Sequence, residues 1–383
     1  MSRWAAEFAA ARCETDKLFS ILDPAALYDR PVAERHRIIF YLGHLEAFDR
    51  NLLSHYALDR PAFEPAFDKL FAFGIDPEPG GAPADRPSDW PSEQQVREYG
   101  ARVRQEVDEK LGDLPEQLLH VAIEHRWMHA ETLAYLFHNL PYDVKRGPMP
   151  AGSDRLGVEN LMLEVPAGTA MLGRPRGDGF GWDNEFDPHS VEVPGFRISK
   201  FKISNGEYLE HVRAGAAAPN FWVQRKGAWW LRAMFGEIPL PLDWPVYVTH
   251  AEADAYAKAR GGSLPTEAQF HRAAEGAAEG PAAVNANFER WDPVAVDAGG
   301  AGSVGPVQMV GNGWEWTSTV FGPFPGFEKF PFYPGYSADF FDGKHFVLKG
   351  ASPRTAGCFL RSSFRNWFRP DYPYLYAGFR ITS

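Results

Sequence analysis

Cysteine is nearly missing from the 383 residues, since only Cys13 and Cys358 occur. Two cysteines cannot form a disulfide framework or a cysteine-rich metal site, and their small number fits a reducing compartment. Long apolar runs are missing too: no stretch approaches 18 apolar residues, and charged side chains interrupt residues 1–21. These absences predict a soluble, cytoplasmic, globular protein that does not enter a membrane.

Long basic runs are also missing. The chain has 39 Lys and Arg against 50 Asp and Glu, which gives a formal net charge of −11. A nucleic-acid-binding surface needs clustered positive charge, so we do not expect nucleic acid as a partner. The length exceeds what one hydrophobic core usually serves and favours two domains, while the oligomeric state stays open.

Glycine and tryptophan are scarce in the first part of the chain. Residues 1–150 contain seven of the 36 glycines and three of the 12 tryptophans. Residues 141–154 have the proline, glycine and charge content of a connecting segment. We therefore predict an N-terminal domain over 1–145, a linker over 146–158 and a second domain over 159–383.

Hydrophobic periodicity predicts four helices in the first domain. Apolar residues recur at helical spacing in a first helix that includes Leu22, and in segments 38–53, 92–111 and 115–140. Helices of these lengths indicate a four-helix bundle, and the long connection over 57–91 is expected to be functional. In the second domain, apolar stretches such as 191–198 and 246–249 alternate with turns around two short helices at 252–260 and 267–274. The predicted fold class is α+β.

The histidines indicate a metal site. His125 and His129 are four residues apart, which places both imidazoles on one face of the fourth helix. His44, among the apolar residues of the second helix, could supply a third nitrogen across the bundle. The ligand type alone allows Zn, Fe, Cu or Ni, and the spacing alone also allows a chance pair that binds nothing.

The second domain resembles the formylglycine-generating-enzyme or sulfatase-modifying-factor fold, which is C-type-lectin-like. Five segments match motifs of that family in the right order: Ile203-Ser204-Asn205-Gly206-Glu207-Tyr208, Leu264-Pro265-Thr266-Glu267-Ala268-Gln269-Phe270, Gly311-Asn312-Gly313-Trp314-Glu315-Trp316-Thr317, Lys349-Gly350-Ala351-Ser352 and Ala377-Gly378-Phe379-Arg380. The fold serves several chemistries, so the match predicts architecture and not activity. Trp314, Trp316 and Phe379 are expected in the core.

The first domain indicates which group of proteins with this second domain the chain resembles. A DinB-like bundle with a histidine in its second helix and a His-x-x-x-His pair in its fourth, fused to this second domain, resembles the EgtB-like sulfoxide synthases of ergothioneine biosynthesis. The resemblance implies a non-heme Fe(II) bound by His44, His125 and His129. It also implies an O2-dependent enzyme that joins a thiol to imidazole C2 of hercynine, or trimethylhistidine, as a sulfoxide.

The same resemblance implies substrate-binding residues. Arg86, followed by Pro87, matches an arginine that meets a carboxylate of the thiol substrate, a task that suits a guanidinium group. Asn366 and Trp367 match a segment that lines the family's active site. Arg369 or Arg380 could meet another acidic group, although Arg380 also fits a buried structural role.

The chain departs from well-studied members at several positions. Met128 replaces a glutamine that contacts the substrate imidazole, and Phe368 replaces an acidic residue of the member that uses γ-glutamylcysteine. Tyr333 and Tyr336 are the tyrosines available for the family's proton donor. Cys358 alone cannot supply the cysteine pair that formylglycine-generating chemistry requires.

Three functions follow from these matches and departures. One is an O2-dependent synthase that forms a carbon–sulfur bond on hercynine. A second is a selenoneine synthase that couples hercynine to a selenosugar, which Phe368 favours. The third is a binding protein with the lectin-like architecture and a bundle without catalytic function. The first two require Fe(II) and small-molecule substrates, and the third requires no metal.

Overall fold

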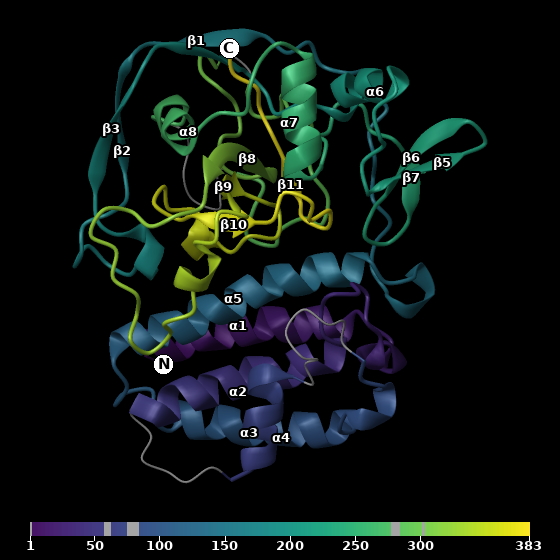
Figure 1. Cartoon of the computed structure of the whole chain (residues 1–383). Helices are drawn as coiled ribbons and strands as arrows, with labels where there is room; N and C mark the ends of the chain where they lie inside the picture. Colours follow the sequence, from purple (N-terminus) through teal and green to yellow (C-terminus); the bar gives the residue numbers. More distant parts are fainter. Residues whose placement is uncertain (1, 57–62, 75–83, 277–283, 301–302) are drawn as a thin grey trace. The chain divides into compact units, whose positions relative to one another are not determined.

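The computed structural model describes residues 2–56, 63–74, 84–276, 284–300 and 303–383. The chain divides into two compact units, Met1–Pro148 and Met149–Ser383, and this division falls inside the predicted linker. Helices form the first unit, and short strands with a few helices form the second (Figure 1), which gives the predicted α+β class. No helix within the described ranges is both long and apolar enough to cross a membrane.

Within its described residues, the first unit contains the four predicted helices and one additional α-helix. Its helices are α1 (Arg3–Ser20), α2 (Ile38–Tyr56), α3 (Pro65–Phe73), α4 (Glu93–Asp108) and α5 (Glu116–His138). The first helix is shorter than predicted: α1 ends at Ser20, and Leu22 lies outside it and pairs with Lys145 in an isolated bridge. The additional helix, α3, lies within the connection over 57–91 and packs against α2.

Helix α4 shows how the sequence specifies the bundle. Ser92 caps its first turn by accepting from the Gln95 backbone NH, and the Gln95 side chain accepts from the Ser92 NH in return. Val96, Tyr99 and Val103, three or four residues apart, are buried on one face. This face lies against α2, which also contacts α3 and α5, so α2 is central to the unit.

The second unit has many short elements. Its helices are α6 (Asn205–Arg213), α7 (His250–Ala259) and α8 (Glu267–Ala273). Its strands are β1 (Met162–Val165), β2 (Gly168–Leu172), β3 (His189–Val193), β4 (Phe196–Ser199), β5 (Trp222–Arg225), β6 (Ala228–Arg232), β7 (Glu237–Pro239), β8 (Gly313–Val320), β9 (Phe346–Ala351), β10 (Asn366–Phe368) and β11 (Ala377–Gly378). The largest described sheet has the order β10-β9-β8-β11, in which only the β8–β11 pair is parallel. Helix α8 packs against β8 and β9, and α7 packs against β8 (Figure 1).

Of the two apolar stretches singled out in the sequence, only 191–198 forms strands. Residues 191–198 contribute to β3 and β4, which are separated by a short turn. Residues 246–249 form no strand, because Val246 donates to the Ile203 carbonyl while Val248 donates to that of Ala377. Their backbone groups are thus satisfied by two separate segments, which an apolar pattern alone does not reveal.

The family motifs begin helices and fill the core. Ser204 and Glu207 form a capping box at the start of α6, and Thr266 and Gln269 form another at α8. The predicted core aromatic residues are all buried, with exposed fractions of 2% or less: Trp314, Trp316 and Phe379.

A buried ion cluster joins distant parts of the second unit. Glu315 on β8 accepts from Lys202 Nζ at 2.5 Å and from Arg380 Nε at 3.0 Å, and all three side chains are fully buried. Arg380 also donates to the backbone carbonyl of Ser199 at 3.1 Å. Its donors are therefore used within the core, which is the structural role considered for it above.

Replacement of Arg380 tests this assignment. We expect Arg380→Leu to lower the free energy of unfolding by about 3–5 kcal/mol, because Glu315 then stays buried with one cation instead of two. Urea denaturation of the variant and the wild type measures the change. The exposed Arg213→Leu on α6 is the control and should change stability by less than about 0.5 kcal/mol. Equal stability of both variants would contradict the role of Arg380.

Candidate functional site

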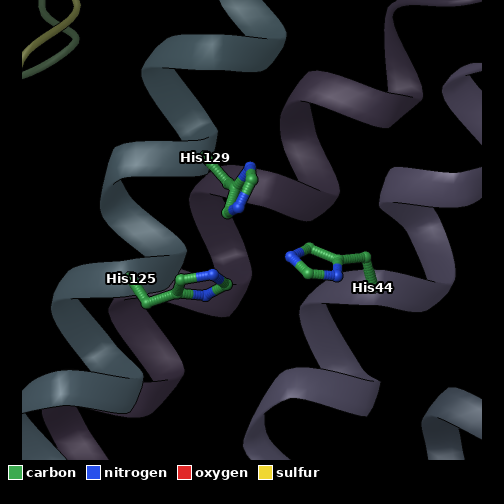
Figure 2. Close-up of side chains that lie close together, drawn as sticks. All are labelled: His44, His125 and His129. Carbon is green, nitrogen blue, oxygen red and sulfur yellow. The ribbon is translucent and has the colours of Figure 1, made fainter. Parts of the chain in front are cut away.

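Three imidazoles converge inside the first unit. His44 comes from α2, and His125 and His129 come from successive turns of α5. Figure 2 shows the three rings turned toward one another between these helices, and one nitrogen of each lies within 4.8 Å of one nitrogen of the others. Small side-chain rotations would place all three nitrogens about 2 Å from one shared metal ion, which is the usual metal–nitrogen distance.

Neighbouring groups fix the orientation of the rings. His44 Nδ1 lies 2.7 Å from the backbone oxygen of Phe71, and because a carbonyl can only accept, this nitrogen carries the proton. The Nε2 atom of His44 is then left with its lone pair. Phe40 stacks on His44 at 4.8 Å between centroids, and Phe48 stacks on His125 at 3.4 Å. These contacts restrict ring rotation.

All three histidines are neutral near pH 7. Burial lowers the pKa of His44 to about 4, against a smaller opposite effect of the Phe71 hydrogen bond. Burial, and then the neighbouring histidines, place the pKa values of His125 and His129 well below the usual range. Neutral imidazole is the form that binds a metal, so the cluster fits a three-nitrogen metal site.

A buried charge network lies next to the cluster. Arg126, the residue after His125, is 1% exposed and donates to Glu46 at 2.8 Å and to Asp49 at 2.9 Å. Glu46 also accepts from Arg104 at 2.9 Å, and Arg104 continues to Asp16 at 2.7 Å. The network thus connects α5, α2, α4 and α1, and it holds the two helices that carry the histidines.

The two buried carboxylates of this network, Glu46 and Asp49, differ in pKa. Burial alone would raise the pKa of Glu46, but the attraction and hydrogen bonds of Arg126 and Arg104 together exceed this effect and lower the pKa to about 2. Asp49 has a pKa raised to about 6, because burial, with the repulsion of Glu46, exceeds the attraction of Arg126. A protonated Asp49 is therefore favoured in the folded protein at mildly acidic pH.

Arg86 and Met128 also belong to the first unit. Arg86 is exposed at the start of a short turn, Pro87–Asp89, where its backbone NH donates to Asp89 at 2.7 Å. The preceding Asp85 is buried and accepts from Arg37 and Trp90, which anchors this segment beside the start of α2. Met128 is half-buried on α5, one residue before His129.

The other predicted site residues belong to the second unit, where aromatic contacts link four of its rings. Trp182 stacks on Tyr336 at 3.9 Å between centroids, and Tyr336 lies at 5.6 Å from Tyr333 and 5.4 Å from Trp367. Burial, together with nearby Asp183, raises the pKa of Tyr333 to about 12. The structure thus brings the two tyrosines and Trp367 into one cluster.

The remaining candidates surround strand β10. Asn366 and Phe368 are half-buried on this strand, whose partner is β9. The Asn366 side chain accepts from the backbone NH of Trp367 at 2.9 Å, and Phe368 stacks on Tyr372. Arg369 follows the strand and is exposed.

Sequence reasoning missed several residues that support these clusters. Phe71 acts through a backbone oxygen, which no side-chain pattern marks. Trp182 and Asp183 are distant in sequence from the tyrosines, yet Asp183 accepts from Ser337 at 2.5 Å. The one available signal was Arg126 between two histidines of an otherwise apolar helix face, since a buried charge requires partners.

Both units match known families. Residues 7–137 match the DinB superfamily, and residues 152–383 match the family described as a sulfatase-modifying factor enzyme 1-like domain. The protein is therefore a DinB-like helical unit followed by a domain of the formylglycine-generating-enzyme type. Among solved structures, PvdO from Pseudomonas aeruginosa matches 58% of this chain and 93% of its own, with 19% identity and a TM-score of 0.44.

Curated relatives narrow the class further. Hercynine oxygenase of Mycolicibacterium smegmatis is 34% identical over 75% of this chain and 77% of its own length. Ergothioneine biosynthesis protein 1 of Schizosaccharomyces pombe is 30% identical over 94% of this chain, which spans about half the length of that relative (53%). The chain belongs to the EgtB-like family, a family of oxidoreductases.

The raised pKa of Asp49 predicts a pH-dependent effect of Asp49→Asn. A carboxyl group whose pKa rises from 3.8 to about 6 on folding stabilises the protein below pH 4 and loses this contribution as the pH rises through 6. Relative to the wild type, Asp49→Asn should therefore gain up to about 3 kcal/mol of stability between pH 4 and pH 7.

Urea denaturation at several pH values measures this difference. The control is Asp113→Asn, an exposed aspartate paired only with nearby Lys110 in the described structure. A stability difference between Asp49→Asn and the wild type that stays constant from pH 4 to pH 7 would contradict the assignment.

Proposed function

We propose that the protein is an Fe(II)-dependent oxygenase that joins the sulfur of a thiol to imidazole C2 of hercynine. One C–H bond and one S–H bond break, a C–S bond forms and the sulfur gains an oxygen atom. The second oxygen atom of O2 leaves as water with both hydrogens, so the four electrons taken from carbon and sulfur balance the reduction of O2. Membership in the EgtB-like family and the three-histidine cluster support this proposal.

His44, His125 and His129 would hold the iron. Iron held by three neutral nitrogens would leave positions for the substrates and would pass electrons from them to O2. The aromatic rings of Phe40 and Phe48 exclude water from one side of two of the ligands. The proton of His44 stays on Nδ1, so its other nitrogen is the ligand.

Tyr333 is our candidate for the proton donor. Its hydroxyl is protonated at neutral pH, as a donor must be before the reaction, and its raised pKa means that it donates only to a stronger base formed during the reaction. Tyr336 stacks on Trp182 and is nearly buried, which suits a role in positioning the segment that carries Tyr333. Asn366, Trp367 and Arg369 are the substrate contacts that we propose for the second unit.

The identity of the donor substrate depends on Phe368 and Met128. A phenyl ring at position 368 cannot pair with the ammonium group of an amino-acid thiol as a carboxylate can, which favours a selenosugar or another donor without that charge. The selenoneine synthase reaction is therefore the second candidate. Met128 cannot donate a hydrogen bond to hercynine as the glutamine does, so imidazole recognition must use other groups.

Anaerobic loading with Fe(II), followed by O2 uptake and mass spectrometry, tests these functions. Hercynine is supplied with cysteine, γ-glutamylcysteine or a selenosugar. A sulfoxide supports the first candidate, and a selenium adduct supports the second. Iron binding without any product would contradict both, and failure to bind iron would leave the lectin-like binding protein.

Loss of a histidine should remove the metal. We expect His125→Ala or His129→Ala to abolish Fe(II) binding and product formation with the helical content unchanged, because two imidazoles alone bind iron weakly. Metal analysis after gel filtration and circular dichroism measure these effects. His120→Ala, on the same helix but outside the cluster, is the matched control and should retain iron. Full occupancy in the His125 or His129 variant would contradict the ligand assignment.

Arg86→Ala should act on substrate binding. We expect the variant to raise KM for an acidic sulfur substrate about tenfold or more while kcat changes less, because the guanidinium group binds a carboxylate that takes no part in bond formation. Steady-state O2 uptake measures both constants, with the exposed Arg97→Ala on α4 as the control. Unchanged KM for every donor would remove Arg86 from the site.

A further inference from the structure

The C-terminal turn of α3 contacts the metal-site histidine of α2. The last carbonyl groups of a helix have no partner within that helix. In α3, the Leu70 carbonyl is used by the backbone NH of Gly74, and the Phe71 carbonyl accepts from His44 Nδ1 at 2.7 Å. The negative end of the helix dipole also favours a donor at this place. This hydrogen bond sets which nitrogen of His44 faces the other two histidines.

Gly43 makes this approach possible. A Cβ atom at position 43 would lie 2.4 Å from Cδ1 and 2.5 Å from Cγ of Phe71, far inside van der Waals contact. The Phe71 ring is fully buried and cannot turn away freely, because it packs against Phe67, Trp90 and Tyr99. Only glycine at position 43 lets α3 come this close to α2.

Other contacts fix α3 in this position. Tyr99 on α4 donates to the Asp68 side chain at 2.7 Å, and Asn51 on α2 donates to the Asp68 backbone oxygen at 3.0 Å. At the end of α3, Gly74 lies against His36, whose ring contacts Phe40 at a tilt, and Phe40 stacks on His44. The helix is thus attached to α2 and α4 and reaches His44 from two directions.

We propose that Gly43 and α3 are the positioning elements of the metal site, and that the Phe71 carbonyl fixes the tautomer and orientation of His44 for metal binding. The inference rests on the proposed metal-binding role of His44. Hydrogen-bond partners of metal-binding histidines commonly alter metal affinity 10- to 100-fold. No side chain of α3 is required to touch the metal or the substrates for this effect.

Gly43→Ala tests the proposal. The added methyl group forces α3 away by roughly 1 Å, which takes the Phe71 oxygen beyond hydrogen-bond distance of His44. We expect Co(II), titrated anaerobically and followed by its visible absorption, to bind 10- to 100-fold more weakly than to the wild type. Gly112→Ala is the matched control, because a Cβ atom there meets nothing within 4 Å, and it should bind Co(II) as the wild type does.

A double variant separates positioning from general damage. In Gly43→Ala/Phe71→Ala the ring that obstructs the methyl group is gone while the backbone carbonyl remains. We expect its Co(II) affinity to match that of Phe71→Ala alone. An affinity as low as that of Gly43→Ala, or a folded Gly43→Ala protein that binds Co(II) like the wild type, would overturn the proposal.

The wild-type protein gives an independent test that does not depend on a variant folding. Long-range proton–nitrogen NMR spectra of metal-free protein with 15N-labelled histidine should show His44 as the Nδ1-protonated tautomer. The Nε2-protonated tautomer would overturn the inference. If the wild type binds neither Co(II) nor Fe(II) although His44 shows the expected tautomer, the metal-dependent function fails and the hydrogen bond stands.

Discussion

The packing of α2 against α5 depends on the burial of the Arg126 guanidinium group. Arg126 is 1% exposed, so its guanidinium group must be compensated inside the bundle, and Glu46 and Asp49 on α2 provide the compensation. Glu46 and Asp49 lie two and five residues after His44 on the same helix. Their contacts with Arg126 therefore set the rotation and height of α2 against α5. The spacing between His44 and the pair on α5 therefore follows from an electrostatic requirement as well as from apolar packing.

Much of the architecture could be predicted from the sequence. Long helices such as α2 and α5 repeat their apolar residues over several turns, and the pair His125 and His129 follows from that period alone. Short elements gave no such signal: α3 has nine residues, and 246–249 is apolar without being a strand. In both cases contacts with residues distant in sequence determine the local structure. Such contacts cannot be predicted from a single sequence.

The candidate site could be predicted in part, for a related reason. Histidines that could bind a metal are recognised in a sequence by their residue type. The groups that orient them act through ring faces and backbone atoms, which residues of many types provide. Phe48 on His125 and Trp182 on Tyr336 are such groups, and their sequence distances from the residues they support are 77 and 154. The resemblance to a family supplied roles for Arg86 and Asn366 that composition and spacing did not contain.

The hydrogen bond between His44 and Phe71 has a consequence for how such sites change in evolution. Its acceptor belongs to the main chain, so any residue at position 71 can provide it, and substitutions there need not alter the metal environment. As long as position 71 carries the Phe ring, the constraint falls on Gly43, which contributes no functional group at all. Comparisons restricted to polar side chains would therefore overlook the position at which this arrangement is most easily lost.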